Sequence, residues 1–352
     1  MTRYLFATAA GIAAMLLTAG GPLSAQETLT EAEAERQGAL STRDVIDDVL
    51  TGAPKAVIDA LGGRLYEVGT ETVMLTDASR EREIVVLWRY PKNFSGKTPL
   101  VIISHGGYGS DRGYSAYPHL GTAYAQIGFV ALNINHLPSA NEDLHRFDRP
   151  TDVTFVINSL VRQRWPNASG PDVLAPPAGF EGEIDLDRIG HTGHSFGAYT
   201  AHALGGAVLA PTMGVTTFRD PRIYAIVPIS PQGGYRFGNY DNGPADNSWT
   251  AITIPSYLMA GELENPTWRR EPFDRYPTRG DKFYTMGGGQ NHGGMGGRGT
   301  DEVRRTLAAN TALFFHVYLR DGEGRCEIGR LAPLPGWTIE RRLDPSAGPG
   351  CR

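Results

Sequence analysis

One pentapeptide has the residue types and spacing of a nucleophile turn. Gly193-His194-Ser195-Phe196-Gly197 is the only G-x-S-x-G in the chain. The strand-like segment Ile184 to His191 precedes it, and a helix-length stretch, Phe196 to Val208, follows. A serine in that context occupies a sharp strand-to-helix turn that lifts its hydroxyl above the sheet, and side chains at the two glycines would collide with neighbouring elements. We therefore expect Ser195 to be a nucleophile.

A serine hydroxyl needs a positioned base, which in this architecture follows the nucleophile and the acid along the chain. Two histidines, His292 and His316, follow the helix after Ser195. His316 lies among apolar residues of the helical stretch Asp301 to Leu319, which is typical of a packed structural histidine. His292 lies in a glycine-rich loop, residues 287 to 299, after the last predicted strand. His292 is the expected general base.

The third member of such a site is a carboxylate that orients the imidazole and stabilises its charged form. The segment Tyr257 to Pro266 has the pattern of a strand running into a turn, with Glu262 and Glu264 at its carboxyl end. Open α/β sheets collect functional groups at that edge. We prefer Glu264 as the acid, and Glu262 remains an alternative.

The tetrahedral intermediate of acyl transfer carries an oxyanion, which backbone N–H groups must meet. Phe196 supplies the amide after the nucleophile. Ser104-His105-Gly106-Gly107-Tyr108-Gly109, directly after a strand ending at Ile103, supplies a second one, expected from Gly107. The stretch lacks GxGxxG and a Lys-Ser/Thr ending, so a phosphate-binding loop is disfavoured. The chain also lacks CxxC and HExxH spacings, and we expect neither a cofactor nor a metal.

Aromatic residues on loops after the predicted strands are candidates for the substrate-binding wall. Tyr108, Tyr235 and Trp268 are the expected contacts, and Trp249 lies on a similar loop. Aromatic walls suit aryl or hydrophobic acyl esters, including polyesters. Packing in the protein interior is the alternative role for each of them.

The elements that must position these residues alternate between strands and helices. A hairpin is expected from the segments 66–75 and 83–90, and helices are expected over 117–126, 152–164, 196–208 and 301–319. Short apolar runs typical of buried parallel strands occupy 99–103, 129–132, 188–189, 223–229, 257–259 and 282–285. This alternation predicts an α/β fold with a mostly parallel, doubly wound sheet and helices on both faces. One catalytic domain is expected over residues 63–352.

The amino terminus has the layout of a secretory signal peptide. Arg3 precedes an apolar run, Tyr4 to Leu17, and Leu23-Ser24-Ala25 precedes a polar segment. The run is shorter than the roughly 20 apolar residues of a membrane anchor, so cleavage after residue 25 and a secreted or periplasmic location are expected. Residues 26–62 are expected to form a helical extension, with one helix over 42–61. In an oxidising compartment the only two cysteines, Cys326 and Cys351, are expected to form a disulfide that pins the tail.

Composition excludes several classes of protein. The 352 residues are 41% hydrophobic and 20% charged, which suits a globular protein rather than a disordered one. Lys and Arg total 33 against 38 Asp and Glu, a net charge of -5, so the basic surface needed for nucleic acid or anionic lipid is not expected. No later segment has the length and apolarity of a membrane span.

Four motifs together resemble the α/β-hydrolase family: residues 105–109, 193–197 and 261–264, and Asn291-His292. The nearest branch is that of exported bacterial predicted dienelactone hydrolases, which are similar to platelet-activating-factor acetylhydrolases and more distantly to bacterial cutinases and polyester hydrolases. The likeness covers roughly residues 65–320 and implies the α/β-hydrolase fold. In the cutinase-like relatives the acid follows the glycine of the seventh strand by three positions, which lands on Glu264. This chain has Glu where Asp is usual.

The motifs and the resemblance together predict a secreted serine carboxylic ester hydrolase that works through an acyl-enzyme. Ser195, His292 and Glu264 form the expected triad, with small or polymeric hydrophobic or aryl esters as substrates. A polyester depolymerase and a phospholipid acetylhydrolase are alternatives. A serine peptidase and a non-catalytic binding module of the same fold are rivals. Serine at the nucleophile position argues against literal dienelactone hydrolysis, which uses Cys.

Overall fold

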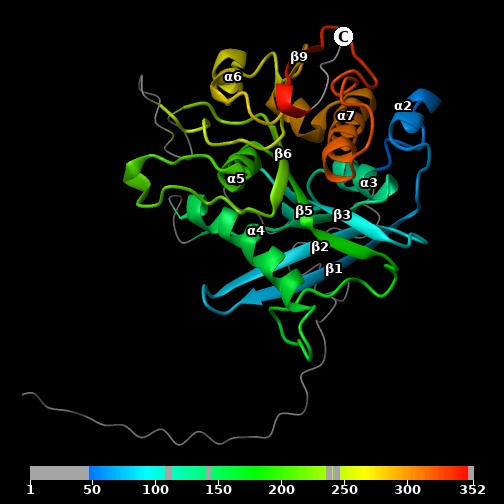
Figure 1. Cartoon of the computed structure of the whole chain (residues 1–352), viewed down its shortest axis with the longest axis vertical. Coiled ribbons are helices and arrows are strands. Elements are labelled where there is room, and N and C mark those ends of the chain that lie inside the picture. Colours follow the sequence, from blue (N-terminus) through cyan, green and yellow to red (C-terminus); the bar gives the residue numbers. More distant parts are fainter. Residues whose placement is uncertain (1–46, 108–112, 140–143, 235–239, 241–245, 348–352) are drawn as a thin grey trace, which may run out of the picture.

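The structure, a computed structural model, describes residues 47–107, 113–139, 144–234, 240 and 246–347 (Figure 1). The predicted signal peptide, residues 1–25, lies outside the described residues, as does the first part of the predicted helical extension. No described helix is long and apolar enough to cross a bilayer.

A single sheet runs through the described part of the chain. Its spatial order is β1-β2-β4-β3-β5-β6-β7-β8-β9. The six strands from β4 to β8 in that order are parallel, whereas β1, β2 and β9 are antiparallel to their neighbours. The strands are β1 (Val68–Asp77), β2 (Arg82–Pro91), β3 (Lys97–Ser104), β4 (Val130–Ile134), β5 (Glu183–His194), β6 (Ile223–Ile229), β7 (Ser256–Gly261), β8 (Lys282–Gly287) and β9 (Thr338–Arg342).

Helices cover both faces of this sheet, as expected. One face packs against α4 and α5, and the other packs against α3 and α7. The helices are α2 (Lys55–Ala60), α3 (Pro118–Gln126), α4 (His145–Arg162), α5 (Phe196–Gly205), α6 (Pro266–Arg275) and α7 (Asp301–Leu319). Short turns are η2 (Gly113–Ser115), η3 (Pro211–Met213), η4 (Gly294–Arg298) and η5 (Pro345–Ala347).

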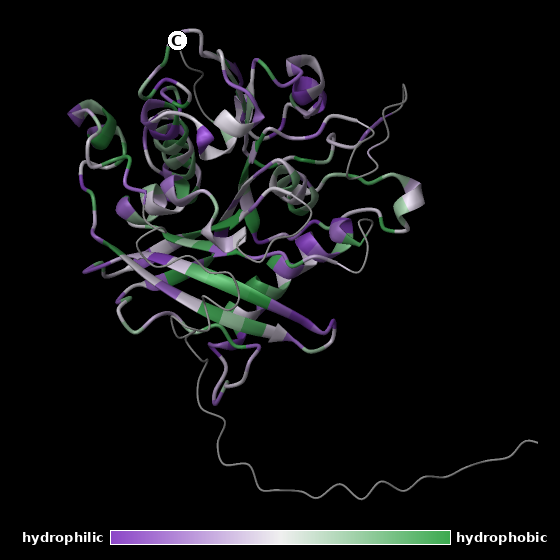
Figure 2. Ribbon diagram, turned by 180° about the vertical axis from the view of Figure 1, so that it is seen from behind, coloured by the Kyte–Doolittle hydropathy of each residue, from purple (hydrophilic) through white to green (hydrophobic). Residues whose placement is uncertain are grey.

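The inner strands are apolar on both sides because both sides are covered. In β3, Leu100 and Ile102 join the core under α4 and α5, whereas Val101 and Ile103 join the core under α3 and α7. The strands inside the molecule are accordingly mostly green in Figure 2. This two-sided burial explains why continuous apolar runs, rather than alternating ones, mark the parallel strands in the sequence.

Helix α4 begins at His145, well before the predicted start at Asp152. Pro150 lies inside the helix. Proline lacks the N–H that would bond to the carbonyl of Arg146, four residues earlier. The hydroxyl of Tyr199, on α5, donates to that carbonyl at 3.0 Å instead. A contact from another helix therefore makes an internal proline tolerable here.

The predicted helix over 42–61 is wrong for most of its described part, because only α2 is helical there. The Asp48 carboxylate accepts hydrogen bonds from the backbone N–H groups of Leu50 and Thr51. Such local side-chain bonds compete with helical backbone bonds. Pro54 then precedes α2, which starts only after it.

Two elements near the carboxyl end, α6 and β9, were not predicted. β9 pairs with β8 at the edge of the sheet. Gly336, which precedes β9, packs closely on Gly288, which follows β8: a Cβ added to Gly288 would lie 2.5 Å from the Gly336 carbonyl oxygen. His316, on α7, packs against Gly322, as expected of a structural histidine. Cys351 lies outside the described residues, so its bridge to Cys326 stays a prediction.

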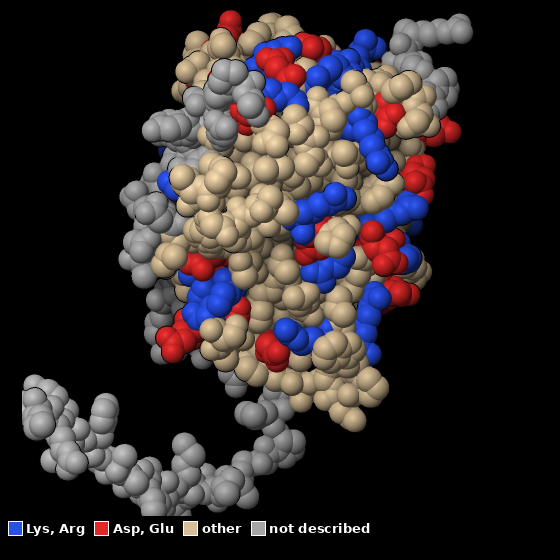
Figure 3. Space-filling model, turned by 60° about the vertical axis from the view of Figure 1, so that its left-hand side comes forward, with Lys and Arg blue, Asp and Glu red and all other residues tan. Residues whose placement is uncertain are grey.

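Charged side chains are intermixed on the face that Figure 3 shows. Lys and Arg lie beside Asp and Glu around an area without charged residues. Such mixing fits the small net charge and gives this face no extended basic patch.

Candidate active site

Ser195 stands at the sharp turn that the sequence predicts, between β5 and α5. Its φ and ψ are 57° and -117°, a conformation that is uncommon for a residue with a side chain and costs about 1–3 kcal/mol. Its backbone N–H donates to Ile229 O at 2.9 Å. A Cβ on Gly193 or Gly197 would lie 2.6 or 2.1 Å from Ser104 O. The two glycines are thus required by contact with β3, and the turn is fixed.

His292 follows β8 and is hydrogen-bonded to Glu264. The His292 Nδ1 to Glu264 Oε2 distance is 2.7 Å, and Glu264 Oε1 accepts from Ser230 Oγ and from the Gly261 N–H, both at 2.6 Å. Burial raises the pKa of Glu264, but the hydrogen bonds from His292, Ser230 and Gly261 outweigh it, and the pKa lies below its ordinary value. The carboxylate is therefore charged and held in place.

The alternative acid, Glu262, has a different partner. Its carboxylate accepts from the Gly289 N–H at 2.8 Å and is exposed. Of the two glutamates at the end of β7, the geometry favours Glu264 as the partner of His292.

An arginine that the sequence did not single out holds the Glu264 carboxylate in place beside His292. Arg269 Nε lies 3.2 Å from Glu264 Oε2, and Arg269 Nη2 lies 3.1 Å from His292 Nδ1. Its Nη1 donates to the carbonyls of Ser230 and Pro231 at 2.7 and 2.8 Å. A nitrogen 2.7 Å from a carboxylate must carry the proton, so His292 Nδ1–H donates to Glu264 and Nε2 is left as the acceptor, an assignment made from the partners. This is the tautomer that a general base requires.

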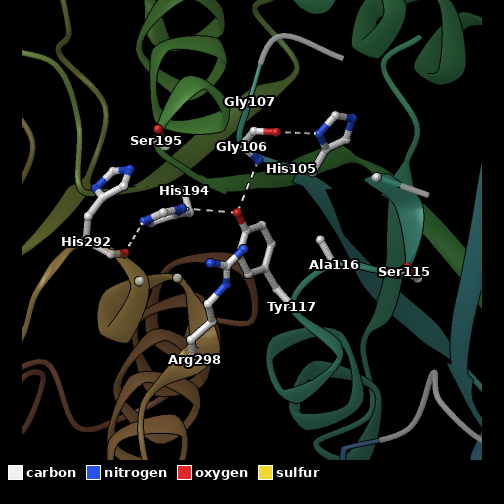
Figure 4. A pocket seen from close by; sticks show the side chains of 13 residues that line it. His105, Gly106, Gly107, Ser115, Ala116, Tyr117, His194, Ser195, His292 and Arg298 are labelled. Atoms are coloured by element: carbon white, nitrogen blue, oxygen red, sulfur yellow. Dashed lines mark hydrogen bonds between the residues drawn. The ribbon is translucent and has the colours of Figure 1, made fainter. Parts of the chain in front are cut away.

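Ser195 and His292 line one cavity of about 560 Å³ together with Gly107 (Figure 4). No hydrogen bond joins Ser195 Oγ to the His292 ring among those that the described residues make. A nucleophile and its base often come into close contact only when substrate binds. The lining residues are His105, Gly106, Gly107, Gly113, Ser115, Ala116, Tyr117, His194, Ser195, His292, Gly293, Gly296 and Arg298.

The two glycines of the loop after β3 line the cavity and differ in the use of their N–H groups. The Gly106 N–H donates to Tyr117 Oη at 3.1 Å, so it is already used. His105 Nε2 accepts from the His136 N–H at 2.9 Å, which leaves Nδ1–H to donate to Gly106 O at 2.7 Å. In a trans peptide the next N–H, that of Gly107, points opposite to this carbonyl. Within the described part of the chain the Gly107 N–H donates to no group, which suits the predicted oxyanion donor.

Arg149, on α4, holds the same loop in place through hydrogen bonds. It is buried, and it donates to Gly107 O at 3.0 Å and also to His105 O. The guanidinium therefore holds the loop through its carbonyls and leaves the N–H groups for other partners.

We call the loop His105–Gly107 the oxyanion loop after its predicted role, and Tyr117 and His194 connect it to the loop that holds His292. His194 Nε2 lies 2.9 Å from His292 O, and since a carbonyl only accepts, Nε2 carries the proton. Burial lowers the pKa of His194 to about 3, so the ring is neutral and its Nδ1 accepts from Tyr117 Oη at 3.1 Å. The chain of donors runs from Gly106 through Tyr117 and His194 to His292 (Figure 4).

A second Ser-His-carboxylate set lies buried under this loop. Ser104 Oγ is 2.9 Å from His136 Nε2, and His136 Nδ1 is 3.0 Å from Asp152 Oδ2. Arg82 donates to both oxygens of Asp152, and His191 Nε2 lies 2.9 Å from Ser104 Oγ. All three members of the set are fully buried. We call Ser104, His136 and Asp152 the buried triplet. Its serine is the last residue of β3, directly before the oxyanion loop.

Of the three predicted aromatic contacts, the structure describes only Trp268. Tyr108 and Tyr235 lie outside the described residues. The Trp268 indole N–H donates to Gly234 O at 3.1 Å, and the residue is not among those lining the Ser195 cavity. Trp249 is fully buried in the core, and Phe196 is 2% exposed. For Trp249, packing is the role that the structure shows.

Two comparisons with known proteins bear on the site. A scan against protein-family models finds no match, and a search of curated proteins finds none either. Within the described residues, no group of three or more His, Cys, Asp or Glu side chains is placed to hold a metal ion.

Proposed function

We propose that the protein is an exported serine carboxylic ester hydrolase with the α/β-hydrolase fold. The observation that carries the proposal is the shared cavity: Ser195, at a strained strand-to-helix turn, and His292, whose Nδ1 is bonded to Glu264, line the same hollow. The order Ser, acid, His along the chain and the position of the acid after β7 agree with the resemblance stated above. Export rests on the signal-like residues 1–25.

The acylation step follows from these positions. Ser195 Oγ attacks the ester carbonyl carbon while His292 Nε2 takes the hydroxyl proton. Glu264 stabilises the imidazolium that forms. The carbonyl oxygen becomes an oxyanion that the N–H groups of Gly107 and Phe196 stabilise. When the C–O bond of the ester breaks, His292 returns the proton to the leaving alcohol, and the acyl group stays on Ser195.

Deacylation uses the same groups in the opposite direction. Water attacks the acyl carbon while His292 Nε2 takes one of its protons. The second tetrahedral intermediate collapses, the bond to Ser195 Oγ breaks, and His292 protonates that oxygen. A carboxylic acid leaves and the hydroxyl of Ser195 is restored.

The test is the loss of ester turnover on Ser195→Ala. Removing a serine nucleophile lowers kcat by about 10⁶-fold in a comparable triad. We expect p-nitrophenyl acetate hydrolysis and labelling by a fluorophosphonate to disappear together. Ser95→Ala, at an exposed serine between β2 and β3, is the matched control and should retain both. Turnover that survives Ser195→Ala in a pure preparation contradicts the proposal.

No observation on the described residues favours a second function. Polymer, phospholipid and peptide substrates each remain possible outcomes of a substrate screen, and absence of fluorophosphonate labelling would instead favour a binding module. The described lining of the cavity is mostly glycine and polar side chains, so a preference for aryl esters rests on the sequence pattern alone.

A further inference from the structure

An arginine that has no partner among the described residues lines the same cavity as the proposed nucleophile. Arg298 is exposed and lines the cavity that Ser195 and His292 also line (Figure 4). It makes no hydrogen bond, ion pair or ring contact with any described residue. Arg149 and Arg269, the other arginines next to the site, are each fully engaged with protein groups. Arg298 thus differs from its neighbours in having donors left for a ligand.

The backbone brings Arg298 to this position through glycines that pack on histidine rings. A Cβ on Gly296 would lie 2.8 Å from the His194 ring, and one on Gly297, whose φ is +88°, would lie 2.6 Å from the His119 ring. Only residues without a side chain fit between these rings and the turn. Met295, in the same turn, is buried in the core. Arg298 is therefore the one charged side chain that the turn Gly294–Arg298 contributes, and it emerges beside the nucleophile.

Among the described residues around Arg298, no carboxylate is free to pair with its charge. None of the described residues that line the Ser195 cavity is Asp or Glu. Arg298 also borders an adjoining hollow that contains Glu264, but Glu264 already binds His292, Ser230 and Arg269. A guanidinium presents a planar fork of donors that matches a carboxylate in two parallel hydrogen bonds.

We propose that the substrate is an ester that carries a second, anionic group, and that Arg298 binds this group as a carboxylate. A monoester of a dicarboxylic acid is the simplest such molecule. The inference rests on the proposed esterase function and adds the substrate class. Arg298 acts on binding, so its contribution appears in KM more than in kcat.

Two pairs of matched esters test this proposal. One pair carries the charge on the acyl side of the ester, and the other carries it on the alcohol side. The acyl arm compares mono-p-nitrophenyl suberate with its methyl ester, which has the same leaving group and no charge. The alcohol arm compares 4-acetoxybenzoate with its methyl ester, each rate divided by its spontaneous hydrolysis. In at least one arm we expect kcat/KM to favour the anionic ester by about tenfold or more, in keeping with a charge-assisted hydrogen bond. The favoured arm identifies the side of the ester on which the carboxylate lies.

The variants separate this inference from the function on which it rests. Arg298→Gln should abolish the preference through KM while neutral esters and fluorophosphonate labelling are unchanged, and Arg298→Lys should keep part of it. Arg279→Gln, at an exposed arginine before β8, is the matched control and should keep all of it. Equal turnover of charged and neutral esters would contradict the proposed role of Arg298 but not the proposed esterase function. Absence of both turnover and labelling overturns both.

Discussion

The molecule contains two sets of serine, histidine and carboxylate with similar hydrogen bonds and opposite surroundings. Ser195 and His292 line one cavity, and Glu264 borders the adjoining hollow together with His292, whose side chain is 42% exposed. The buried triplet, Ser104, His136 and Asp152, is sealed in the core, with all its hydrogen bonds made. The exposed set lacks the serine-histidine bond that the buried set has.

The difference shows that the residue types of a triad do not make a site by themselves. Burial lowers the pKa of His136 well below its ordinary value, so this ring has no tendency to take a proton. No ester reaches Ser104, whose side chain is at zero exposure. The buried triplet instead fixes the end of β3, from which the oxyanion loop departs. The residue types that we propose to activate a nucleophile at the cavity form a rigid support where they are buried.

The largest effect on the exposed set after loss of Ser195 is expected from Glu264→Gln. The amide can donate to His292 Nδ1 and so favours the tautomer with the proton on Nε2, which cannot accept from Ser195. We expect kcat to fall by about 1,000- to 10,000-fold. Steady-state kinetics of p-nitrophenyl acetate hydrolysis measure it. Glu262→Gln, on the neighbouring glutamate, should stay within about twofold, since surface groups away from the chemistry contribute little. A reversed result would make Glu262 the acid.

In the buried triplet the corresponding change, Asp152→Asn, should act on stability. It leaves the guanidinium groups of Arg80 and Arg82 without the charge they pair with. Breaking a buried ion pair from one side costs about 3–5 kcal/mol of unfolding free energy. Urea denaturation measures this loss, with Asp274→Asn, at an exposed ion pair, as control. The protein that remains folded should still label at Ser195, and loss of labelling from folded protein would place the buried triplet in the chemistry.

A smaller effect is expected where the two regions meet, at Tyr117. In Tyr117→Phe the Gly106 N–H and His194 Nδ1 each lose a partner. An unsatisfied buried group costs about 1–3 kcal/mol, and if the oxyanion loop shifts, kcat/KM should fall by about tenfold. Tyr224→Phe, at an exposed tyrosine on β6, is the control. Lower stability with unchanged kcat would show that Tyr117 only packs.

The smallest effect concerns acid stability. The pKa of Glu264 is lower in the folded protein than its ordinary value of 4.5. Its ionised form therefore stabilises the fold above pH 4.5, and this contribution is lost as the pH falls through the folded pKa. The difference in urea midpoint between the natural chain and Glu264→Gln should shrink below pH 4.5. A constant difference from pH 3 to pH 7 would show that the carboxylate does not titrate in this way.

Much of the fold could be predicted because its signals are local. The run Ile223–Ile229 and the helix Asp301–Leu319 have the predicted bounds, since one is continuously apolar and the other has a Thr300 cap that accepts from the Val303 N–H. α6 and β9 gave no such signal. α6 contains Pro272 and is rich in arginine, and β9 carries the charges Glu340, Arg341 and Arg342 on a sheet edge.

The candidate site divides in the same way. Ser195 could be predicted from a pentapeptide, and the pairing of His292 with Glu264 from chain order. Arg269, Tyr117 and His194 could not, because their roles depend on contacts between segments far apart in the sequence. For His194, the tautomer follows only from the His292 carbonyl that it meets. The alternation of strands and helices in the sequence does not predict such contacts between distant segments.

The carboxyl-terminal segment has a consequence for how long the proposed activity would last. β9 borders the strand that leads to His292, and the backbone at Gly336 touches that at Gly288 at the start of the same loop. A protease that trims the chain soon after α7 would remove this brace and leave the nucleophile and the rest of the sheet in place. In a preparation trimmed in this way, the position of the His292 imidazole would be lost first. The rest of the protein would stay folded for longer.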